Sequence, residues 1–572
     1  MPNVSRKQFI LISTSLLLIA TGGWLYSRRP QRVFIASYVP ESSLGYLEIT
    51  DWPQLAGNLT STKAWQQLAP NYGIDNKLNY IGKLGWLARL TGGGEAGMLA
   101  RSQFAIVITG LEVRGEEVRP RMALIAETHS SGSDLRQVIE KRLPDFARRI
   151  YGRESKETNQ YGGVTVTSYD SGIPERKLFS AQIDSEWILA NHPDSLRACI
   201  DTRLGRAPSL ANNFYLQNSR PFVEGSGDLF GFITSQGVTR MLRFGAYLLS
   251  NSAIGETGLS GILEDVLTDF ASHTSDGIAY GESFENGVVV DRYNLLFKPD
   301  LVESLKPVIK VNDGELQSLD YIPPTAKGVT VFNLVDPNKT LDSIEAAISA
   351  RIGVGQSFLL HQFLIGARES FLGVKSGEMG RPSIGDEIAS YDLTEESENR
   401  VWLIAAKDRG KLRQVIDRYL SWEGATVRRE KYSDVEILIS SNARRGSAVF
   451  IGEYLALGRR AQLIHLIESR HNGQNLKNTP QFRSATRPPK QSAVISFSSV
   501  KDDSDAMMQT LAQLIGGAGN KQSDVTELDG LPFATSATSL NKQGIYLESH
   551  SPFGNFPLFV SLIDDLTGSK SN

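Results

Sequence analysis

The 572-residue sequence is nearly devoid of cysteine, and this scarcity limits its chemistry. The one cysteine, Cys199, excludes an intramolecular disulfide and a four-cysteine zinc site. The formal net charge of −3 gives no basic excess for a nucleic-acid partner. The GK[ST] end of a P-loop, the HExxH zinc motif, GxSxG and the kinase signatures are also absent. We therefore predict no catalytic residue, cofactor or metal ligand, and favour a protein that is not an enzyme.

The composition is nevertheless that of a folded protein. It is 41% hydrophobic and 22% charged, which argues against disorder as the default state. A chain of 572 residues is too long for one ordinary domain, so two to four domains are expected.

The longest uncharged run, Gln8–Ser27, predicts a transmembrane helix. Twenty residues at about 1.5 Å rise span about 30 Å, which is the thickness of the bilayer's hydrocarbon core. Arg6 and Lys7 precede the run, and Trp24 and Tyr26 lie where interfacial aromatic residues are expected. Residues 1–32 are thus predicted to be a cytoplasmic tip and a membrane anchor.

A cleaved signal peptide is the alternative for this segment, with Phe9–Ala20 as its apolar core. An uncleaved anchor is favoured because the apolar run continues past the poor cleavage site at Ala20–Gly22. Flanking basic residues are nearly balanced, so orientation rests on the signal-anchor form and the low cysteine count. Ser5–Ile10 resembles a twin-arginine signal, but lysine replaces the second arginine. The prediction is a single-pass protein of the cell inner membrane with its bulk in the periplasm.

The rest of the sequence contains an internal duplication. SDLRQVIEKRL at 133–143 is written again as GKLRQVIDRYL at 410–420. Further matches keep the same order along the chain: Tyr38–Pro40 with Tyr321–Pro323, Tyr161–Val164 with Tyr432–Val435, Glu186–Ala190 with Glu453–Leu457, Arg220–Pro221 with Arg487–Pro488, and Gly287–Val289 with Gly544–Tyr546. The offset falls from 283 to 257, as expected if the second copy lost short loop segments. We predict a first repeat at 33–310 and a second at 316–567.

Periodicity in both copies predicts an α+β fold with antiparallel sheets and packed helices. Leu135, Val138, Ile139 and Leu143 are spaced as one apolar helix face, with Ser133 or Asp134 as cap and Pro144 as a kink or end. Strands are expected near 103–111, 120–127, 228–233 and 277–297, with hairpins between the helices. Pro193 suits the first turn of a second helix. Regular βαβ alternation is lacking, so a parallel sheet is not expected.

Two groups of residues have types that can carry chemistry. Cys199 could be a nucleophile, but Leu466 is its counterpart on the same apolar helix face, so a buried, inert thiol is favoured. His465, Glu468 and His471 have i, i+3, i+6 spacing, which places three possible metal ligands over a wide arc of a helix. The first copy lacks these residue types there, so a polar helix face is favoured.

Three further segments could suggest a binding function, but a purely structural interpretation is favoured for each. Thr91–Gly97 is rich in glycine but is not a phosphate-binding motif, and a flexible connection is favoured. The arginine pairs at 148–149, 428–429 and 444–445 are expected on solvated faces. The amphipathic region Val238–Phe270 can cover a sheet as core or line a groove for a lipid or partner helix, and core is favoured.

The sequence resembles an uncharacterised family of bacterial membrane-anchored, internally duplicated extracytoplasmic proteins, a domain of unknown function. The resemblance rests on a proline-containing turn followed by a strand, at Val39–Ser42 and again at Ile322–Thr325, and on the N-terminal anchor. It implies no catalytic residue.

Three functions are weighed from these features. The first is a membrane-anchored binding or scaffolding protein with a protein partner in the cell envelope. The second is a carrier or sensor of a lipid or another apolar ligand, for which a large apolar cavity is required. The third is a hydrolase-type enzyme with a site between the two lobes, for which converging ionisable groups are required.

Overall fold

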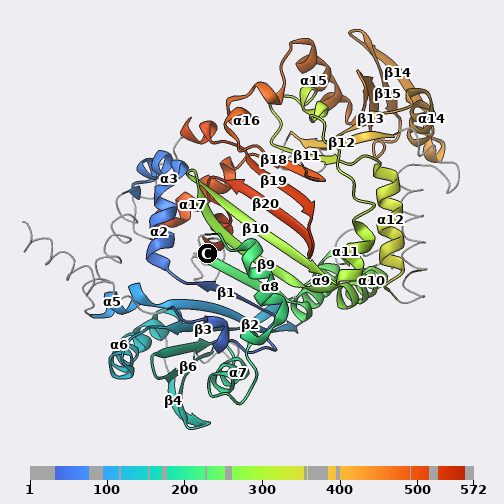
Figure 1. Ribbon diagram of the computed structural model, residues 1–572. Helices are drawn as coiled ribbons and strands as arrows, with labels where there is room; N and C mark the ends of the chain where they lie inside the picture. The colour runs from blue at the N-terminus through green and yellow to red at the C-terminus, as the bar shows by residue number, and fades with distance from the viewer. Residues whose placement is uncertain are drawn as a thin grey trace, which may run out of the picture. The chain divides into compact units, whose positions relative to one another are not determined.

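The computed structural model forms two compact units (Figure 1). The first comprises Met1–Thr60 and Asn76–Asn213, and the second comprises Ser61–Asp75 and Phe214–Asn572. The structure describes residues 32–75, 94–114, 117–151, 155–170, 177–225, 229–250, 260–352, 357, 384–393, 400–489, 491–514 and 526–560.

An antiparallel sheet forms the framework of the first unit. Its described strands follow the order β1-β2-β3-β7-β6-β5-β4. Their bounds are β1 (Gly45–Ile49), β2 (Gln103–Arg114), β3 (Glu117–Glu127), β4 (Ser155–Tyr161), β5 (Val164–Asp170), β6 (Lys177–Ile183) and β7 (Glu186–Ala190). The strands predicted near 103–111 and 120–127 are confirmed as β2 and β3.

Turn chemistry explains the β4–β5 hairpin. Gly162 and Gly163 have φ of +61° and +85°, and a two-residue turn with both φ positive matches the right-handed twist of the strands. In the second repeat, Ser433 takes φ +52° at the matching position between β14 and β15. The two hairpins thus share a left-handed first turn residue, whereas the second turn residue has a positive φ at Gly163 and not at Asp434.

The helices of the first unit are α2 (Trp52–Ser61), α5 (Gly94–Arg101), α6 (Gly132–Tyr151) and α7 (Pro193–Arg203). Helix α6 confirms the predicted apolar face, because Leu135 and Leu143 are buried. Two details of that prediction are wrong. Ser131 Oγ accepts a hydrogen bond from Asp134 N at 3.2 Å, so the cap precedes the residues we expected. Of the kink or end expected at Pro144, the end is wrong, because the helix continues to Tyr151.

The helix continues through Pro144 because its neighbours are buried on both sides. Leu143 and Ala147 lie in one cluster with Tyr169 of β5. A proline removes one helical hydrogen bond and costs about 3 kcal/mol, an amount comparable to the burial of two apolar side chains. Pro193, in contrast, stands in the first turn of α7 as predicted.

One large antiparallel sheet forms the framework of the second unit. Its described strands follow the order β8-β9-β10-β20-β19-β18-β11-β12-β13-β17-β16-β15-β14. Their bounds are β8 (Leu229–Thr234), β9 (Ser275–Glu285), β10 (Val288–Phe297), β11 (Gly328–Asn333), β12 (Ile384–Asp392), β13 (Arg400–Ala406), β14 (Val427–Tyr432), β15 (Val435–Ser440), β16 (Ser447–Ile451), β17 (Tyr454–Gly458), β18 (Val494–Ser498), β19 (Ala534–Leu540) and β20 (Gly544–Ser551).

Strand order repeats along the chain. The order β1-β2-β3-β7-β6-β5-β4 has the same form as β11-β12-β13-β17-β16-β15-β14, and β8-β9-β10 has the same form as β18-β19-β20. The repeat boundaries at 33–310 and 316–567 stay a prediction, and the compact units divide the chain differently, after Asn213.

The predicted fold of two tandem units, each with its own sheets, needs correction. Strands β8–β10 of the first repeat share one sheet with the whole second repeat, because β10 pairs antiparallel with β20. Under the offset of 257, Asp291 matches Glu548 and Arg292 matches Ser549. These four residues form two neighbouring pairs of the β10–β20 ladder, Asp291 with Ser549 and Arg292 with Glu548. Matching edges thus pair with each other, which removes two exposed strand edges.

The predicted transmembrane helix is the second correction to the fold. Within the part of the chain that the structure describes, no helix is both long enough and apolar enough to cross a membrane. The predicted anchor, residues 8–27, lies outside the described residues. The fold of the described residues is therefore α+β with antiparallel sheets.

Helices of the second unit cover its sheet at several places. They are α3 (Lys63–Leu68), α8 (Phe214–Val223), α9 (Ser235–Ser250), α10 (Ser260–Thr274), α11 (Pro299–Leu305), α12 (Pro337–Ser349), α14 (Arg409–Leu420), α15 (Arg460–His471), α16 (Pro480–Ser484) and α17 (Lys501–Leu514). Helices α8 and α9 contact β9, and α9 contacts α10. The amphipathic region Val238–Phe270 falls on α9 and α10, where Val238 and Val266 are buried and Phe270 packs on Leu301 and Leu305 of α11. Val238, Val266 and Phe270 thus serve as core, whereas Met241 on the same region is 53% exposed.

Candidate functional site

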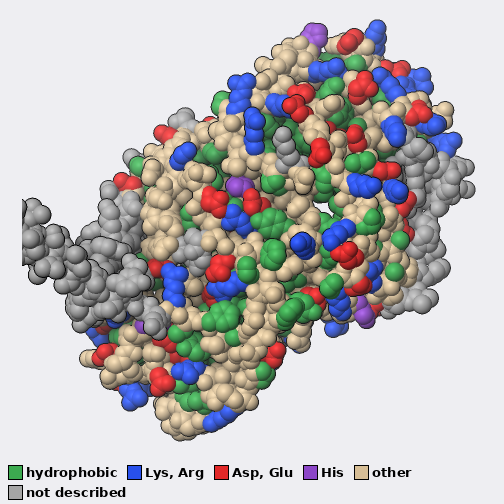
Figure 2. Space-filling view, viewed as in Figure 1, with side chains coloured by type: hydrophobic (Ala, Val, Ile, Leu, Met, Phe, Trp, Pro, Cys, Tyr) green, Lys and Arg blue, Asp and Glu red, His purple; other side chains and the backbone are tan. Residues whose placement is uncertain are grey.

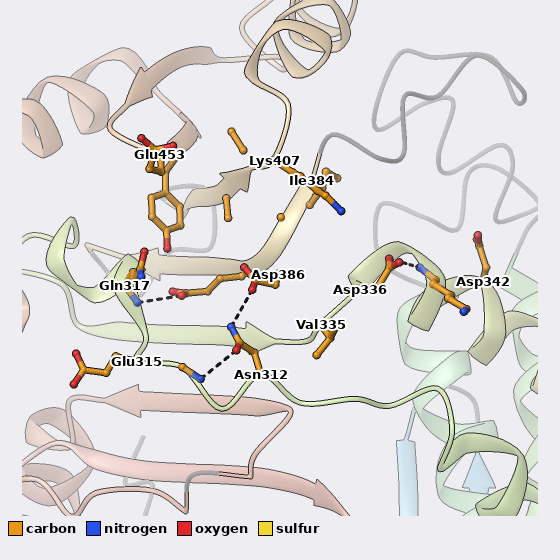
Figure 3. Close-up of a pocket in the computed structure, with 17 residues that line it drawn as sticks. Asn312, Glu315, Gln317, Val335, Asp336, Asp342, Ile384, Asp386, Lys407 and Glu453 are labelled. Atoms are coloured by element: carbon orange, nitrogen blue, oxygen red, sulfur yellow. Dashed lines mark hydrogen bonds between the residues drawn. The ribbon is translucent and has the colours of Figure 1, made fainter.

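A pocket of about 870 Å³ in the second unit is the candidate site (Figure 3). Five segments meet there: residues 312–317, the start of α12, the start of β12, the end of β13 and the turn between β16 and β17. Six carboxyl side chains line it: Glu315, Asp336, Asp342, Asp386, Glu387 and Glu453. Lys339 and Lys407 are the basic residues of the lining, so the formal charge of the lining is −4 when all eight groups are ionised.

The floor of the pocket is built around Glu387. This side chain is only 4% exposed, and it accepts hydrogen bonds from the backbone N–H groups of Gln317 at 3.0 Å and Ser318 at 2.8 Å. Tyr454 also hydrogen-bonds to Glu387, and burial followed by the charge of Glu387 raises the pKa of the Tyr454 hydroxyl. Tyr454 therefore stays a neutral donor, and Glu387 is held in place as a structural acceptor.

The rim of the pocket is held by an asparagine and a helix cap. Asn312 Nδ2 donates to Asp386 Oδ2 at 3.0 Å, and Asn312 Oδ1 accepts from Gly314 N at 3.1 Å (Figure 3). Asp336 caps α12 by accepting from Lys339 N at 3.0 Å, as expected for aspartate at a helix N-terminus. These bonds fix the rim before any ligand arrives.

Gly385 is needed for the close approach of β12 to β13 beside the pocket. A Cβ atom at this position would lie 2.9 Å from Ala405 Cβ. The β12–β13 register shifts between Ile384 and Ile388, which is a bulge. Irregular pairing of this kind re-aims side chains, and Asp386 and Glu387 of this segment line the pocket.

The chemistry of this lining suits binding of positive charge. Opposite charges several ångströms apart attract strongly where protein replaces water, and an acidic hollow concentrates cations. The pocket's lining residues include no serine, threonine, cysteine or histidine. A hydroxyl or thiol nucleophile paired with a histidine base is therefore not present among them.

The first repeat uses the same positions differently. Strand register places Gln103 where the second repeat has Glu387. Gln103 accepts from Val33 N at 2.9 Å and donates to Val33 O at 3.0 Å, so it also ties down the chain that leads into its repeat. His129 Nε2 lies 3.0 Å from Gln103 Oε1. The position is thus structural in both repeats, with an amide in one and a carboxylate in the other.

Glu186 and Glu453 show the same divergence. Glu453 lines the pocket and is exposed, whereas its match Glu186 has no exposed surface and lies 2.8 Å from Arg203 Nε. Burial raises the pKa of the Glu186 carboxyl to about 8, against the opposing effect of Arg203. The guanidinium of Arg203 also lies 5.1 Å from the Tyr38 ring centre. The match of this stacked pair in the second repeat is Arg470 over Tyr321 at 5.0 Å.

Motif reasoning missed the residues of the pocket because they come from five segments and form no motif. A comparison of the two repeats, position by position, could have identified residues of the pocket. Positions where one copy has a carboxylate and the other a different group, such as Gln103 and Glu387, mark where the repeats have diverged in chemistry.

The prediction for Cys199 is confirmed. Its side chain has no exposed surface, and burial raises the pKa of its thiol to about 12. Leu466, its counterpart in α15, is buried to the same extent. A buried thiol that resists ionisation is inert as a nucleophile.

The three possible metal ligands on α15 are His465, Glu468 and His471, and the first two contact other side chains of the protein. His465 Nε2 lies 2.8 Å from Thr325 Oγ1, and Glu468 accepts from the Tyr432 hydroxyl at 2.5 Å. Among the described residues, no group of three or more His, Cys, Asp or Glu side chains could hold a metal ion.

The arginine pairs and the glycine-rich stretch are the remaining candidates from the sequence. Arg148 pairs with Asp145 at 3.4 Å, Arg428 with Glu430 at 3.1 Å, and Arg445 lies 5.1 Å from the Tyr419 ring centre. On the face shown in Figure 2, basic and acidic side chains are interspersed. Of the glycine-rich stretch, residues 91–93 lie outside the described residues, and the rest begins α5.

Comparisons of the chain with family models, curated proteins and solved structures found no match. The resemblance to an uncharacterised bacterial family therefore stays a prediction from the sequence.

Proposed function

We propose that this protein is a non-enzymatic binding or scaffolding protein, and that the acidic pocket of its second repeat receives a basic segment of a protein partner. The observation that carries the proposal is the charge of the lining, six carboxyl groups against two lysines around about 870 Å³. A buried or half-buried site of one sign favours a ligand of the opposite sign and speeds its arrival. The envelope location expected from the sequence stays a prediction.

A peptide segment suits the pocket better than an apolar ligand. Drug-sized ligands fill pockets of about 300–1,000 Å³ that are mostly apolar, whereas the carboxylates here would lose hydration against a lipid chain without compensation. Lysine and arginine side chains restore that lost hydration through charge-assisted hydrogen bonds. The rim, held by Asn312 and Asp336, offers a preformed surface, which lowers the entropy cost of binding.

The test compares three forms of the full chain in pull-down from detergent-solubilised cells, followed by native mass spectrometry. The pocket variant is Glu315→Gln, Asp386→Asn and Glu453→Gln together, which leaves the structural acceptor Glu387 intact. The matched control removes three exposed carboxyl groups elsewhere, by Glu140→Gln, Glu303→Gln and Asp434→Asn. We expect a stoichiometric protein partner with the unmodified chain and the control, and at least tenfold less with the pocket variant.

The other outcomes contradict the proposal. A partner that the pocket variant retains at equal occupancy would place binding elsewhere on the molecule. A small added mass that organic extraction removes would identify an apolar-ligand carrier instead. A bare monomer in all three samples would refute the scaffolding role.

A further inference from the structure

Two buried carboxyl groups face each other in the sheet of the second unit, away from the acidic pocket. Glu282 of β9 and Asp291 of β10 are directly paired in the strand register, and they are 1% and 3% exposed. The Tyr280 hydroxyl lies between them, 2.7 Å from Asp291 Oδ1 and 3.2 Å from Glu282 Oε2. The Tyr280 hydroxyl is shared by both carboxyl groups, and two negative charges this close and this well buried repel each other.

The segment Pro552–Val560, here called the strap, covers this cluster after β20 ends. Asn555 Nδ2 donates to Asp291 Oδ1 at 3.1 Å and lies 3.1 Å from the Tyr280 hydroxyl, and it also contacts the Tyr293 hydroxyl. Phe553 is 2% exposed, so the start of the strap is well packed.

Gly554 brings the strap backbone directly over Asp291. Its φ is +55°, and a Cβ atom there would lie 2.8 Å from Asp291 Oδ2 and 2.5 Å from Val289 Cγ1. A residue with a side chain would not allow this approach. The strap is therefore what separates the Asp291 carboxyl from water on this side.

The strap also forms one wall of a second hollow of about 410 Å³. Asp503 and Met507 of α17 line the opposite wall, and Asn555 and Leu558 line the strap side. Leu558 is 56% exposed, so the outer part of the strap is held less firmly than Phe553. Movement of the strap would open this hollow.

We infer that the strap is a pH-sensitive latch, held shut by Asn555 over the Asp291–Tyr280–Glu282 cluster and loosened when Asp291 loses its proton. Opening exposes the carboxylate to water, whereas the closed strap keeps it buried. The groups that face Asp291 are Tyr280 and Glu282 on β9, Tyr293 on β10 and Asn555 on the strap, and Asp503 of α17 lies on the hollow's far wall.

The direction of the effect follows from linkage. Burial raises the pKa of Asp291 to about 6 against the opposing hydrogen bonds of Tyr280 and Asn555, while an exposed aspartate titrates near its ordinary value. The closed strap thus binds a proton more tightly than the open strap does. As pH rises from about 4 to about 6, opening increases by up to roughly 100-fold, and above that range it levels off.

Hydrogen exchange measured by mass spectrometry on the full chain tests the latch. The amides of Phe556 and Phe559, which donate to Phe553 O and Asn555 O, report opening once rates are corrected for the intrinsic pH dependence of exchange. We expect corrected exchange in the strap to rise with pH over the stated range. Asp291→Asn, which cannot ionise, should abolish that rise, and the matched control Asp503→Asn should keep it.

A second variant covers the case in which Asp291→Asn does not fold. Asn555→Ala removes the latch amide and keeps Asp291, so strap exchange should be faster at every pH. Its rise with pH should persist and be larger, because the lost Asn555 hydrogen bonds are among the effects that lower the pKa of Asp291 in the closed strap. Corrected exchange of the unmodified strap that does not change with pH would overturn the latch. A pH dependence that survives in Asp291→Asn would overturn it as well.

Discussion

The substitutions Glu387→Gln and Gln103→Glu, which swap the residue types of the two matched positions, should each lower the stability of the protein. Each side chain has the donors and acceptors that its neighbouring backbone groups require. Glu387 faces two N–H groups, of Gln317 and Ser318, and so needs two acceptor oxygens. Gln103 faces one N–H and one C=O, both of Val33, and so needs one acceptor and one donor. Glu387→Gln places an amide donor against a donor, and Gln103→Glu places an oxygen against the Val33 carbonyl oxygen.

The cost is set by burial. Glu387 is 4% exposed and Gln103 is 2% exposed, so water cannot replace the lost partner. A buried polar group left without a hydrogen bond costs about 1–3 kcal/mol. With a central figure of about 2 kcal/mol and a urea slope of about 3 kcal/mol/M, the unfolding midpoint should fall by roughly 0.7 M. Gln103→Glu should cost more, since it also buries a charge.

Urea titration read by hydrogen exchange of β12 peptides measures Glu387→Gln, and the same reading on β2 peptides measures Gln103→Glu. The exposed pair Glu140→Gln and Gln137→Glu repeats the chemical changes on α6, and both should leave the midpoint within about 0.2 M. A Glu387→Gln midpoint equal to that of the unmodified chain would show that the N–H groups of Gln317 and Ser318 do not depend on this carboxylate. The assignment of Glu387 as a structural acceptor would then be wrong.

Burial predicts that Cys199 does not react with a thiol reagent in the native protein at neutral pH and reacts fully in denaturant, and rapid native labelling would contradict its packing. Because burial raises the pKa of Glu186 from 4.5 to about 8, the stability it influences is greatest below pH 4.5 and falls as pH rises to about 8. Glu186→Gln should flatten that decline between pH 4.5 and about 8 in thermal melts. Glu548 has the opposite sign: hydrogen bonds from His550 and Tyr546 and the charge of Arg292 lower its pKa to about 2, so stability is lost as pH falls from its ordinary value toward 2. Glu548→Gln should remove that acid loss, and an unchanged acid limb would refute the assignment.

Local patterns in the sequence predicted the elements well. The apolar face of 133–143 and of 410–420 predicted α6 and α14, because side chains spaced by three and four residues share one helix face whatever lies beyond it. The same logic, applied to Cys199 and Leu466 together, predicted a buried thiol. The error at Pro144 arose because a local rule for proline was overruled by packing of Leu143 and Ala147, which the sequence does not display.

The sequence by itself determined the duplication and the kind of element at each place, because these depend on residues near one another in the chain. Only the tertiary structure decided that β10 of the first repeat pairs with β20 of the second, since Arg292 and Glu548 meet across more than 250 residues. It also decided which carboxyl groups share the acidic pocket and which, such as Asp291 and Glu282, face each other in a buried sheet. Such long-range contacts depend on strand register and on which strand edges pair with each other. The spacing of residues along the sequence does not encode them.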